Sequence, residues 1–202
     1  MSQKLANQHA LLTGAGGGIG AAVARAFATE GARCSVVDIG SAPSADVQQL
    51  MADFPSAIQY ISCDVTDTGA IKQMVAKATS TFGAIHTLFN NAAIFDMAPL
   101  LESNEAMYDK IFAVNVKGAF FVMQAVLQHM VDSGTKGAVI NMASQAGRRG
   151  EALVSHYCAS KAAMDNMTRS LARALAPAIR VLSIAPGWVE GEYASRADPA
   201  YL

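Results

Sequence analysis

The stretch TGAGGGIG, from Thr13 to Gly20, joins a short apolar run to a segment of helical spacing. A turn between a strand and a helix leaves free backbone N–H groups at the positive end of the helix dipole, where a pyrophosphate binds well. Glycines let that backbone turn sharply and approach phosphate oxygens closely. The spacing G-x-x-x-G-x-G departs from the general G-x-G-x-x-G fingerprint, so the strand and helix around it carry the prediction of a dinucleotide site. A flexible glycine turn is the alternative.

The alternation of strand and helix continues along the chain. Apolar runs of strand length alternate with segments of helical period, which predicts βαβ units around a parallel sheet. We expect strands at His9–Thr13, Arg33–Asp38, Ile58–Ser62, His86–Asn90, Ala138–Met142 and Ile179–Ile184. We expect helices at Gly18–Glu30, Ala45–Phe54, Asp67–Phe82, Ser103–Phe112, Asn115–Asp132 and Ser155–Ala176, with AVNVKG separating the fourth from the fifth.

Length and repeats predict a single domain. A chain of 202 residues without repeats or linkers forms one ordinary domain, here placed over residues 1–202. The sequence after Ile184 offers no further strand to complete the sheet. We therefore expect a truncated chain, with the last strand and the substrate lid incomplete after about Val189.

Charge and cysteine content narrow the partners and the compartment. Lys and Arg number 15 against 16 Asp and Glu, which gives a net charge of −1 and no basic field for nucleic acid or anionic lipid. A small molecule is the expected partner. Cys34, Cys63 and Cys158 lack paired spacing, and the first residues lack an apolar signal core, so we expect a reduced, cytoplasmic protein. Polar residues and glycines interrupt every apolar stretch, which predicts no membrane span.

Asp38 ends the second expected strand, 18 residues beyond Gly20. An acidic residue at this place accepts hydrogen bonds from the adenosine ribose hydroxyls and repels a 2′-phosphate. Neither the glycine loop nor residues 39–42 offer a Lys or Arg to neutralise such a phosphate. The position therefore predicts NAD rather than NADP, with a simple turn residue as the alternative.

Tyr157 and Lys161 form a Y-x-x-x-K pair on one face of a helix, and Ser144 follows the strand Ala138–Met142 at the sheet edge where ligands bind. These groups suit hydride transfer to or from a carbonyl. A phenol has a pKa of about 10, so a phenolate base near neutral pH needs roughly 4 kcal/mol of stabilisation. The Lys161 ammonium can supply it, while Ser144 hydrogen-bonds the substrate oxygen.

The histidines and the apolar helix faces have plainer interpretations. His9, His86, His129 and His156 show no ligand spacing, so no metal site is expected, and His156 points either into the pocket of Tyr157 or away from it. The helix from Asn115 carries an apolar stripe that fits either core packing or a subunit interface. Its members are Phe120, Phe121, Met123, Val126 and Met130. With so little charge in the chain, we expect a homo-oligomer, a dimer or a tetramer.

An ordered set of motifs resembles the short-chain dehydrogenases/reductases. The set comprises TGAGGGIG, Asp64 in CDV, NNAA at 90–93, Asn115 in NVKG, Ser144, YCASK at 157–161 and Pro186–Gly187, and the resemblance runs from His9 to about Val189. It implies a doubly wound, Rossmann-like domain with helices on both faces of a parallel sheet, usually a homotetramer.

The resemblance also implies roles for individual residues. Tyr157 would be the catalytic acid/base, Lys161 would lower its pKa and hold the nicotinamide ribose, Ser144 would position the substrate oxygen, and Asn115 would hold a water in a proton relay. The implied NAD-binding residues are Gly14, Gly17, Gly18, Ile19, Gly20, Asp38, Asp64, Val65, Asn91, Ala92, Ala93, Tyr157, Lys161, Pro186, Gly187 and Val189.

Two longer segments, NNAAIFDMAPLLE and VINMASQAGRRGEALVSHYCASKAA, resemble the bacterial sorbitol (polyol) dehydrogenases within the family. That implies a sugar alcohol as substrate, bound by Ser144, Gln145, Glu151, Tyr157 and Trp188. Gln145, Glu151, Glu190 and Glu192 suit hydroxyl groups, whereas Phe95, Met97 and Trp188 suit an apolar substrate. A reductase of 3-oxoacyl thioesters or of cyclic and steroid ketones therefore remains an alternative, as does a dinucleotide-binding protein without turnover.

Overall fold

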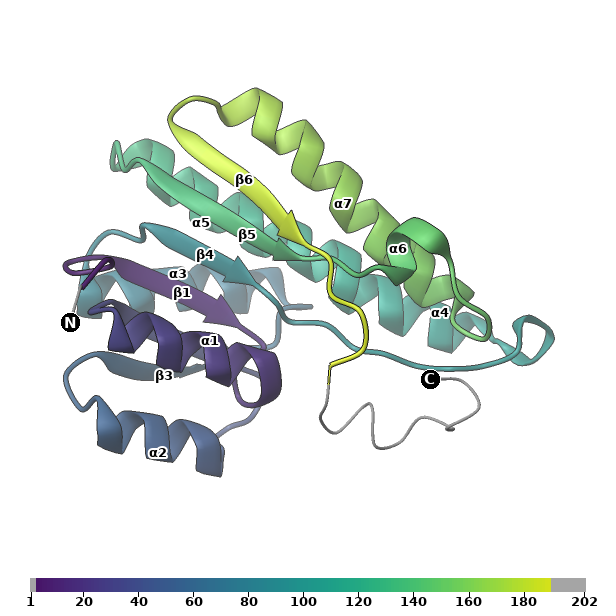
Figure 1. The fold of residues 1–202 in the computed structure, drawn as a ribbon, viewed down its shortest axis with the longest axis horizontal. Helices are drawn as coiled ribbons and strands as arrows, with labels where there is room; N and C mark the ends of the chain where they lie inside the picture. The colour runs from purple at the N-terminus through teal and green to yellow at the C-terminus, as the bar shows by residue number, and fades with distance from the viewer. Residues whose placement is uncertain (1–2, 190–202) are drawn as a thin grey trace.

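Parallel strands form the centre of the protein, whose computed structural model describes residues 3–189 (Figure 1). The strands are β1 (His9–Thr13), β2 (Arg33–Asp38), β3 (Ile58–Ser62), β4 (Thr87–Asn90), β5 (Gly137–Met142) and β6 (Ile179–Ile184). They form one six-stranded sheet in the order β3-β2-β1-β4-β5-β6. The strand order reverses between β1 and β4, and ligands of open α/β sheets bind at the carboxyl ends beside such a reversal.

Helices cover both faces of the sheet. In Figure 1, α1 (Gly18–Thr29) and α2 (Ala45–Asp53) lie in front of it, while α3 (Thr68–Phe82), α5 (Ala119–Asp132) and α7 (Ser155–Leu175) lie behind it. Neighbouring residues of β1 point to opposite faces of the sheet. Leu12 packs in the core under α1 and α2, and Leu11 packs in the core under α3 and α5. A strand buried on both faces reads as a continuous apolar run, as β1 does. The predicted doubly wound fold is confirmed.

The fourth and fifth expected helices are one continuous helix, and the prediction of a separating segment was wrong. After the single turn η1 (Leu100–Glu102), α4 (Glu105–Phe112) runs through a π-helical segment, η2 (Ala113–Gly118), into α5. Among residues 3–189 this 28-residue helix is the one that is long and apolar enough to cross a membrane, so the sequence-based exclusion of any such stretch was also wrong. Part of its apolar side chains, among them Val122, Met123 and Val126, pack in the core, however, and core helices of the same composition pass the same test.

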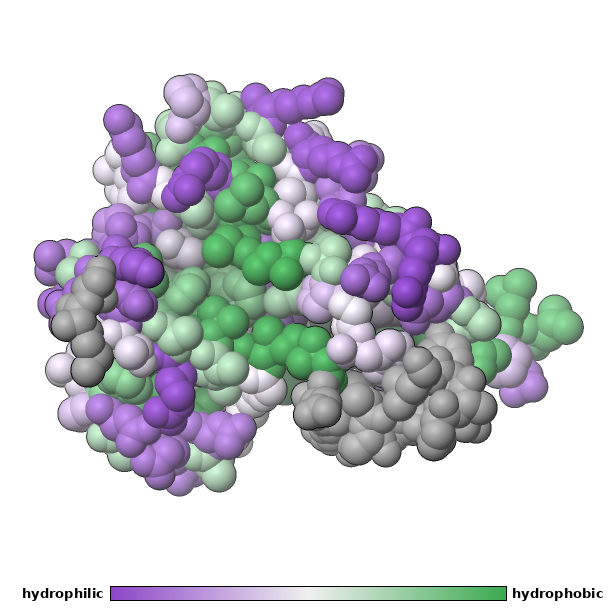
Figure 2. Space-filling model, in the orientation of Figure 1, coloured by the Kyte–Doolittle hydropathy of each residue, from purple (hydrophilic) through white to green (hydrophobic). Residues whose placement is uncertain are grey.

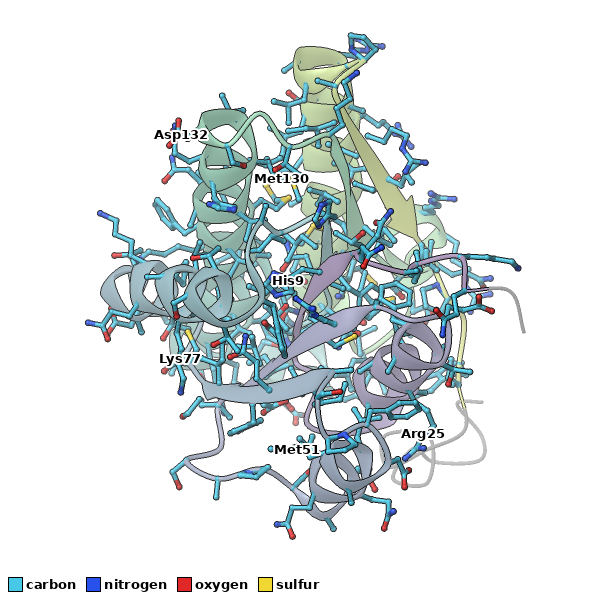
Figure 3. All side chains as sticks on the ribbon, turned by 90° about the vertical axis from the view of Figure 1, so that its left-hand side faces the viewer. His9, Arg25, Met51, Lys77, Met130 and Asp132 are labelled. Atoms are coloured by element: carbon cyan, nitrogen blue, oxygen red, sulfur yellow. The ribbon has the colours of Figure 1, made fainter. Side chains whose placement is uncertain are left out.

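Three of the four histidines gather at the amino ends of the strands, the end at which Figure 3 labels His9. His9 is fully buried there, with its Nδ1 3.0 Å from the Gly83 carbonyl oxygen and its Nε2 2.7 Å from Ser35 Oγ. His86 Nδ1 accepts the His9 backbone N–H, and His129 Nε2 accepts that of Ile85. Burial lowers the pKa of His9 to about 4. The histidines are thus neighbours, although their spacing in the sequence gave no sign of it.

One part of the α1 face of the sheet is bare. Helices α1 and α2 pack over β1, β2 and β3, and among the described residues no helix packs on the same face of β6. Leu182 and Ile184 alternate along β6 with the buried Val181 and are each 49% exposed. Figure 2 shows the resulting apolar surface in the middle of this side of the molecule.

Candidate active site

The glycine loop after β1 lies against the segment that follows β4. Gly14 has a φ of +60°, and a Cβ built on it would lie 2.6 Å from Ala92 Cα, so only glycine fits there. Asn91 Nδ2 donates to the carbonyl oxygens of Thr13 and Gly14 at 3.1 and 2.8 Å. Thr13 Oγ1 in turn accepts the backbone N–H groups of Asn91 and Ala92. The predicted residues Gly14, Asn91 and Ala92 therefore meet at the strand-order reversal, and Ala93 is the next residue in the sequence.

The start of α1 is open to an anion. Gly17 is the N-cap and provides no side-chain cap, and the first turn, with Gly18, Ile19 and Gly20, has no acidic residue. Ser44, Asp67 and Asn104, in contrast, cap α2, α3 and α4 through their side chains. The N-cap and first turn of α1 thus supply no side chain to the free backbone N–H groups there, which suits a pyrophosphate.

Asp38 stands at the end of β2, against the glycine loop. Its Oδ2 accepts the Gly16 backbone N–H at 2.7 Å, and its Oδ1 accepts that of Ile39 at 2.8 Å. The Ser44 hydroxyl donates to the Gly16 carbonyl from the other side. The carboxylate is therefore held at the rim of the loop. Gly16 was not among the predicted cofactor residues, although its place as the first of three consecutive glycines, Gly16 to Gly18, was a signal for it.

The residues after β3 reach the same edge. Asp64 Oδ1 accepts the backbone N–H and the hydroxyl of Thr66, both at 2.8 Å, so this carboxylate shapes the turn before α3. Val65 is buried against η2, where a Cβ on Gly118 would lie 2.8 Å from the Val65 carbonyl oxygen. The close approach fixes the start of α5 beside this turn.

Lys161 is the most deeply buried cation of the site. Lys161 is 3% exposed, and its Nζ donates to the Met142 carbonyl at 2.8 Å. The same Nζ lies 5.7 Å from the centre of the Tyr157 ring. Burial lowers the pKa of Lys161 to about 8. Met142 is the last residue of β5, so this hydrogen bond brings the Y-x-x-x-K face of α7 to the strand end that Ser144 follows.

Ser144 lies between β5 and the short helix α6 (Ala146–Arg149). Its Oγ accepts the Ala146 backbone N–H at 3.2 Å. The next residue, Gln145, donates its backbone N–H to the Pro186 carbonyl at 3.0 Å, and its side chain lies beside Gly187. The Ser144 loop and the segment after β6 are thus neighbours at the carboxyl edge of the sheet.

Asn115 lies inside the π-helical segment and is buried. Its Oδ1 accepts the Ile94 N–H at 2.8 Å, and its Nδ2 donates to the Ile94 carbonyl and to Ser160 Oγ at 2.9 and 3.2 Å. Ser160 Oγ donates to the Tyr157 carbonyl at 2.7 Å. The amide thus ties η2 both to α7 and to the segment after β4. Sequence reasoning missed Ser160 and Ile94, because contacts made across the fold leave no local pattern.

Two aromatic rings follow Tyr157 in a row. Phe95 meets the Tyr157 ring edge to face with centres 4.9 Å apart, and Trp188 meets Phe95 in the same way at 5.9 Å. Of the polar candidates, Glu151 Oε1 accepts two N–H groups of Arg149. Val189 is half exposed at the end of the described segment, and Glu190 and Glu192 lie outside it.

His156 points away from these rings. It lines a cavity of about 200 Å³ between α4 and α7, together with Leu100, Ser103 and Tyr108, and Tyr157 is not part of that lining. Both ring nitrogens are buried, and neither has a hydrogen-bond partner among residues 3–189. Over the same residues, no group of three His, Cys, Asp or Glu side chains is arranged to hold a metal ion.

Known proteins share this sequence and fold. The family described as short chain dehydrogenase matches residues 8–201. Sorbitol dehydrogenase of Cereibacter sphaeroides is 44% identical over 199 residues, which cover 98% of this chain and 77% of that one. Galactitol 2-dehydrogenase of Agrobacterium fabrum is 47% identical over 191 residues, covering 94% and 73%. A crystal structure described as NAD⁺-bound xylitol dehydrogenase superposes with a TM-score of 0.87 at 32% identity, covering 95% and 74%. The chain is a member of the short-chain dehydrogenase family.

Proposed function

We propose that the protein oxidises a secondary hydroxyl group of a sugar alcohol, such as sorbitol, to a ketone with NAD. The observation that carries the proposal is the buried Lys161 ammonium, held by Met142 at the end of β5 and 5.7 Å from the Tyr157 ring. A buried cation beside a phenol has a chemical use that packing alone does not explain. Relatives named for sorbitol and galactitol support a polyol as the substrate class.

The cofactor would lie along the carboxyl edge of the sheet. The uncapped start of α1 would hold the pyrophosphate, and the Asp38 carboxylate would accept from the adenosine ribose and disfavour a 2′-phosphate. The other predicted contacts are Asp64, Val65, Asn91, Ala92, Ala93, Pro186, Gly187 and Val189. When bound, NAD supplies the hydride acceptor.

Tyr157 is the proton acceptor in this proposal. Its phenolate takes the hydroxyl proton of the substrate, and the Lys161 ammonium favours that phenolate electrostatically. Because burial brings the pKa of Lys161 to about 8, the side chain keeps its charge at neutral pH. Ser144 Oγ hydrogen-bonds the same substrate oxygen and fixes its direction.

Asn115 supports a proton relay through its main chain. Its side-chain amide already bonds Ile94 and Ser160, so we assign the relay water to the Asn115 backbone carbonyl. The side chain then has a different task, which is to hold the π-helical segment against α7. Gln145 would add hydrogen bonds to the substrate hydroxyls, while Glu151 would need to leave Arg149 to do so.

A second candidate is the reduction of an apolar cyclic ketone. The Phe95 ring against Tyr157 and the Trp188 ring against Phe95 favour it, because an aromatic wall suits a hydrocarbon ring as well as the C–H face of a polyol.

The two candidates separate in one assay. Purified protein is mixed with NAD and sorbitol, galactitol or xylitol, and NADH formation is followed by absorbance, while cyclic ketones with NADH are followed in reverse. We expect the highest kcat/KM with a polyol. Faster turnover of cyclic ketones would favour the second candidate, and no turnover with any substrate would contradict both.

We also propose a cytoplasmic homo-oligomer. The outer side of η2, α5 and α7 carries a groove of about 600 Å³, with a lining that includes Phe112, Val116, Phe120 and Met167. A second copy of the chain would cover this apolar surface. Cys34 and Cys63 are buried free thiols, as suits a reducing compartment.

A further inference from the structure

Asp165 is a buried carboxylate that the chemistry above does not use. It lies on α7 one turn after Lys161, and its side chain is 10% exposed. Its Oδ1 accepts from Arg148 Nη2 at 3.1 Å and from Ser183 Oγ at 2.8 Å. Its Oδ2 accepts from Arg169 Nη2 at 2.8 Å. These donors hold the pKa of Asp165 below its ordinary value, with the Arg148 hydrogen bond as the largest cause.

The Arg148 contact fixes the loop of Ser144. Arg148 belongs to α6, which begins two residues after Ser144, and the Gly147 backbone N–H donates to the Ser144 carbonyl. Helix α6 also packs directly on α7, since a Cβ built on Gly147 would lie 2.7 Å from the Lys161 carbonyl carbon. The loop is therefore held on α7 by one close backbone approach and one ion pair.

The Ser183 contact fixes a second segment. Ser183 is the penultimate residue of β6, three positions before Pro186. The Ile184 carbonyl accepts from Ala143, and the Pro186 carbonyl accepts from Gln145, so this strand end also lies against the Ser144 loop. A single carboxylate oxygen thus joins α6, α7 and β6 around the site.

We propose that Asp165 is a positioning residue for the oxidation, which holds the Ser144 hydroxyl in register with Tyr157. The inference rests on the proposed function. Arg148 and Arg169 are 55% and 69% exposed, so each stays solvated when its partner is neutralised, and the fold tolerates the change. A misplacement of about 1 Å at a reacting group can cost as much as 10²-fold in rate.

Arg169 provides the matched control. It bonds the same carboxylate, but it lies on α7 four residues after Asp165 and so joins that helix only to itself. We compare Asp165→Asn, Arg148→Met and Arg169→Met after their melting temperatures are known. The first two are expected to lower kcat about tenfold with KM for NAD within about twofold, and Arg169→Met to stay within about twofold of wild type.

A double-mutant cycle tests the route through Ser144. If Arg148 acts by placing Ser144, Arg148→Met costs little further rate once Ser144→Ala has removed the hydroxyl. If Arg148→Met instead damages the fold in general, the double variant loses kcat by the product of the factors that Arg148→Met and Ser144→Ala each cost alone. Multiplied losses, or kcat values of Asp165→Asn and Arg148→Met equal to that of Arg169→Met, would overturn the proposal.

Hydrogen exchange separates this inference from the proposed function. Amides of residues 143–150 are expected to exchange faster in Asp165→Asn and Arg148→Met than in wild type or Arg169→Met, whether or not a substrate is known. Unchanged exchange in both variants would overturn the positioning role of Asp165. Faster exchange in a protein that oxidises or reduces none of the substrates tested would contradict the proposed function, but it would still support the role of Asp165 in holding the Ser144 loop.

Discussion

At the scale of single residues, the Tyr157 hydroxyl decides between turnover and binding. Tyr157→Phe keeps the ring packing against Phe95 and removes only the proton acceptor. We expect polyol oxidation to fall by at least about 10²-fold while NADH affinity, measured by fluorescence titration, stays nearly constant. Tyr108→Phe, at an exposed tyrosine of α4, is the control. Near-normal rates in Tyr157→Phe would mean that another group takes the proton.

Lys161 combines a functional charge with a cost to stability. Its pKa of about 8 lies below the ordinary 10.5, so folding disfavours the charged form. The free-energy cost of burying the charged ammonium is complete below pH 8. It disappears as the pH rises from about 8 to 10.5, because the folded protein loses the proton in this range while the unfolded chain still holds it. Lys161→Met is therefore expected to raise the unfolding free energy at pH 7 by up to about 3 kcal/mol and to abolish turnover.

Urea unfolding at pH 7 and pH 10 measures this effect, and Lys72→Met on α3 provides the control. The gain from Lys161→Met should shrink at the higher pH. A loss of stability at both pH values would show that the hydrogen bond to Met142 outweighs desolvation. Lys161→Ala should also weaken NADH binding and move the rise of oxidation rate with pH toward the free phenol pKa of about 10.

Asp38 sets cofactor preference in our interpretation. We expect kcat/KM to be far higher with NAD than with NADP, and Asp38→Ala to narrow the ratio. Asp46→Ala is the control. Asp46 is on α2 with its carboxylate near Gly17, so this substitution also removes one negative charge from the neighbourhood of the glycine loop. Equal kcat/KM for the two cofactors in the wild type would contradict the assignment.

The contacts of the site residues differ in how far the sequence alone could predict them. Tyr157 and Lys161 are four positions apart on one helix, so their common face follows from helical geometry. Thr13, by contrast, bonds Asn91 across 78 residues, and Asp165 bonds Ser183 between two elements. Such contacts depend on strand order and on crossing helices. No local spacing encodes them, and they appear only once the sheet is assembled.

At the scale of elements, the strands were easier to place than the long helix. Runs such as RCSVVD of β2 have the apolar continuity of strands buried on both faces. AVNVKG contains a glycine and β-branched residues, which indicates a break, yet it forms a π-helical turn whose last residue, Gly118, lies close against Val65. Tertiary contact overrides local preference here.

The amino end of β1 makes the fold sensitive to acid. Since burial lowers the pKa of His9 to about 4, the folded state resists a proton that the unfolded state takes up at about 6.5. The contribution of neutral His9 to the free energy of unfolding is fully present above pH 6.5. It is lost as the pH drops toward 4, by up to about 3 kcal/mol. Urea unfolding of wild type and His9→Leu at pH 7 and pH 4.5 measures it.

His9→Leu should be less stable than wild type at pH 7, because Ser35 and Gly83 lose a partner, but it should lose less stability on acidification. His156→Leu controls for the removal of a buried histidine at the other end of the sheet. An identical pH dependence in wild type and His9→Leu would assign the acid sensitivity to other groups.

At the scale of the whole molecule, the groove on η2, α5 and α7 predicts self-association. Phe120 is 41% exposed at its lining. We expect light scattering at micromolar concentration to give a multiple of 21.1 kDa, and Phe120→Glu to shift the mass toward the monomer. Val131→Glu, at an exposed position near the end of α5, should leave the mass unchanged. A wild-type mass near 21 kDa would contradict the prediction.

The bare part of the α1 face, over β6, has a consequence for how the sequence can change. Among the described residues β6 pairs only with β5, and Leu182 and Ile184 fill no part of either core. Replacing them by polar residues therefore creates no cavity in the described cores. A polar residue at Leu182 or Ile184 should cost far less unfolding free energy than one at the buried Val181 of the same strand.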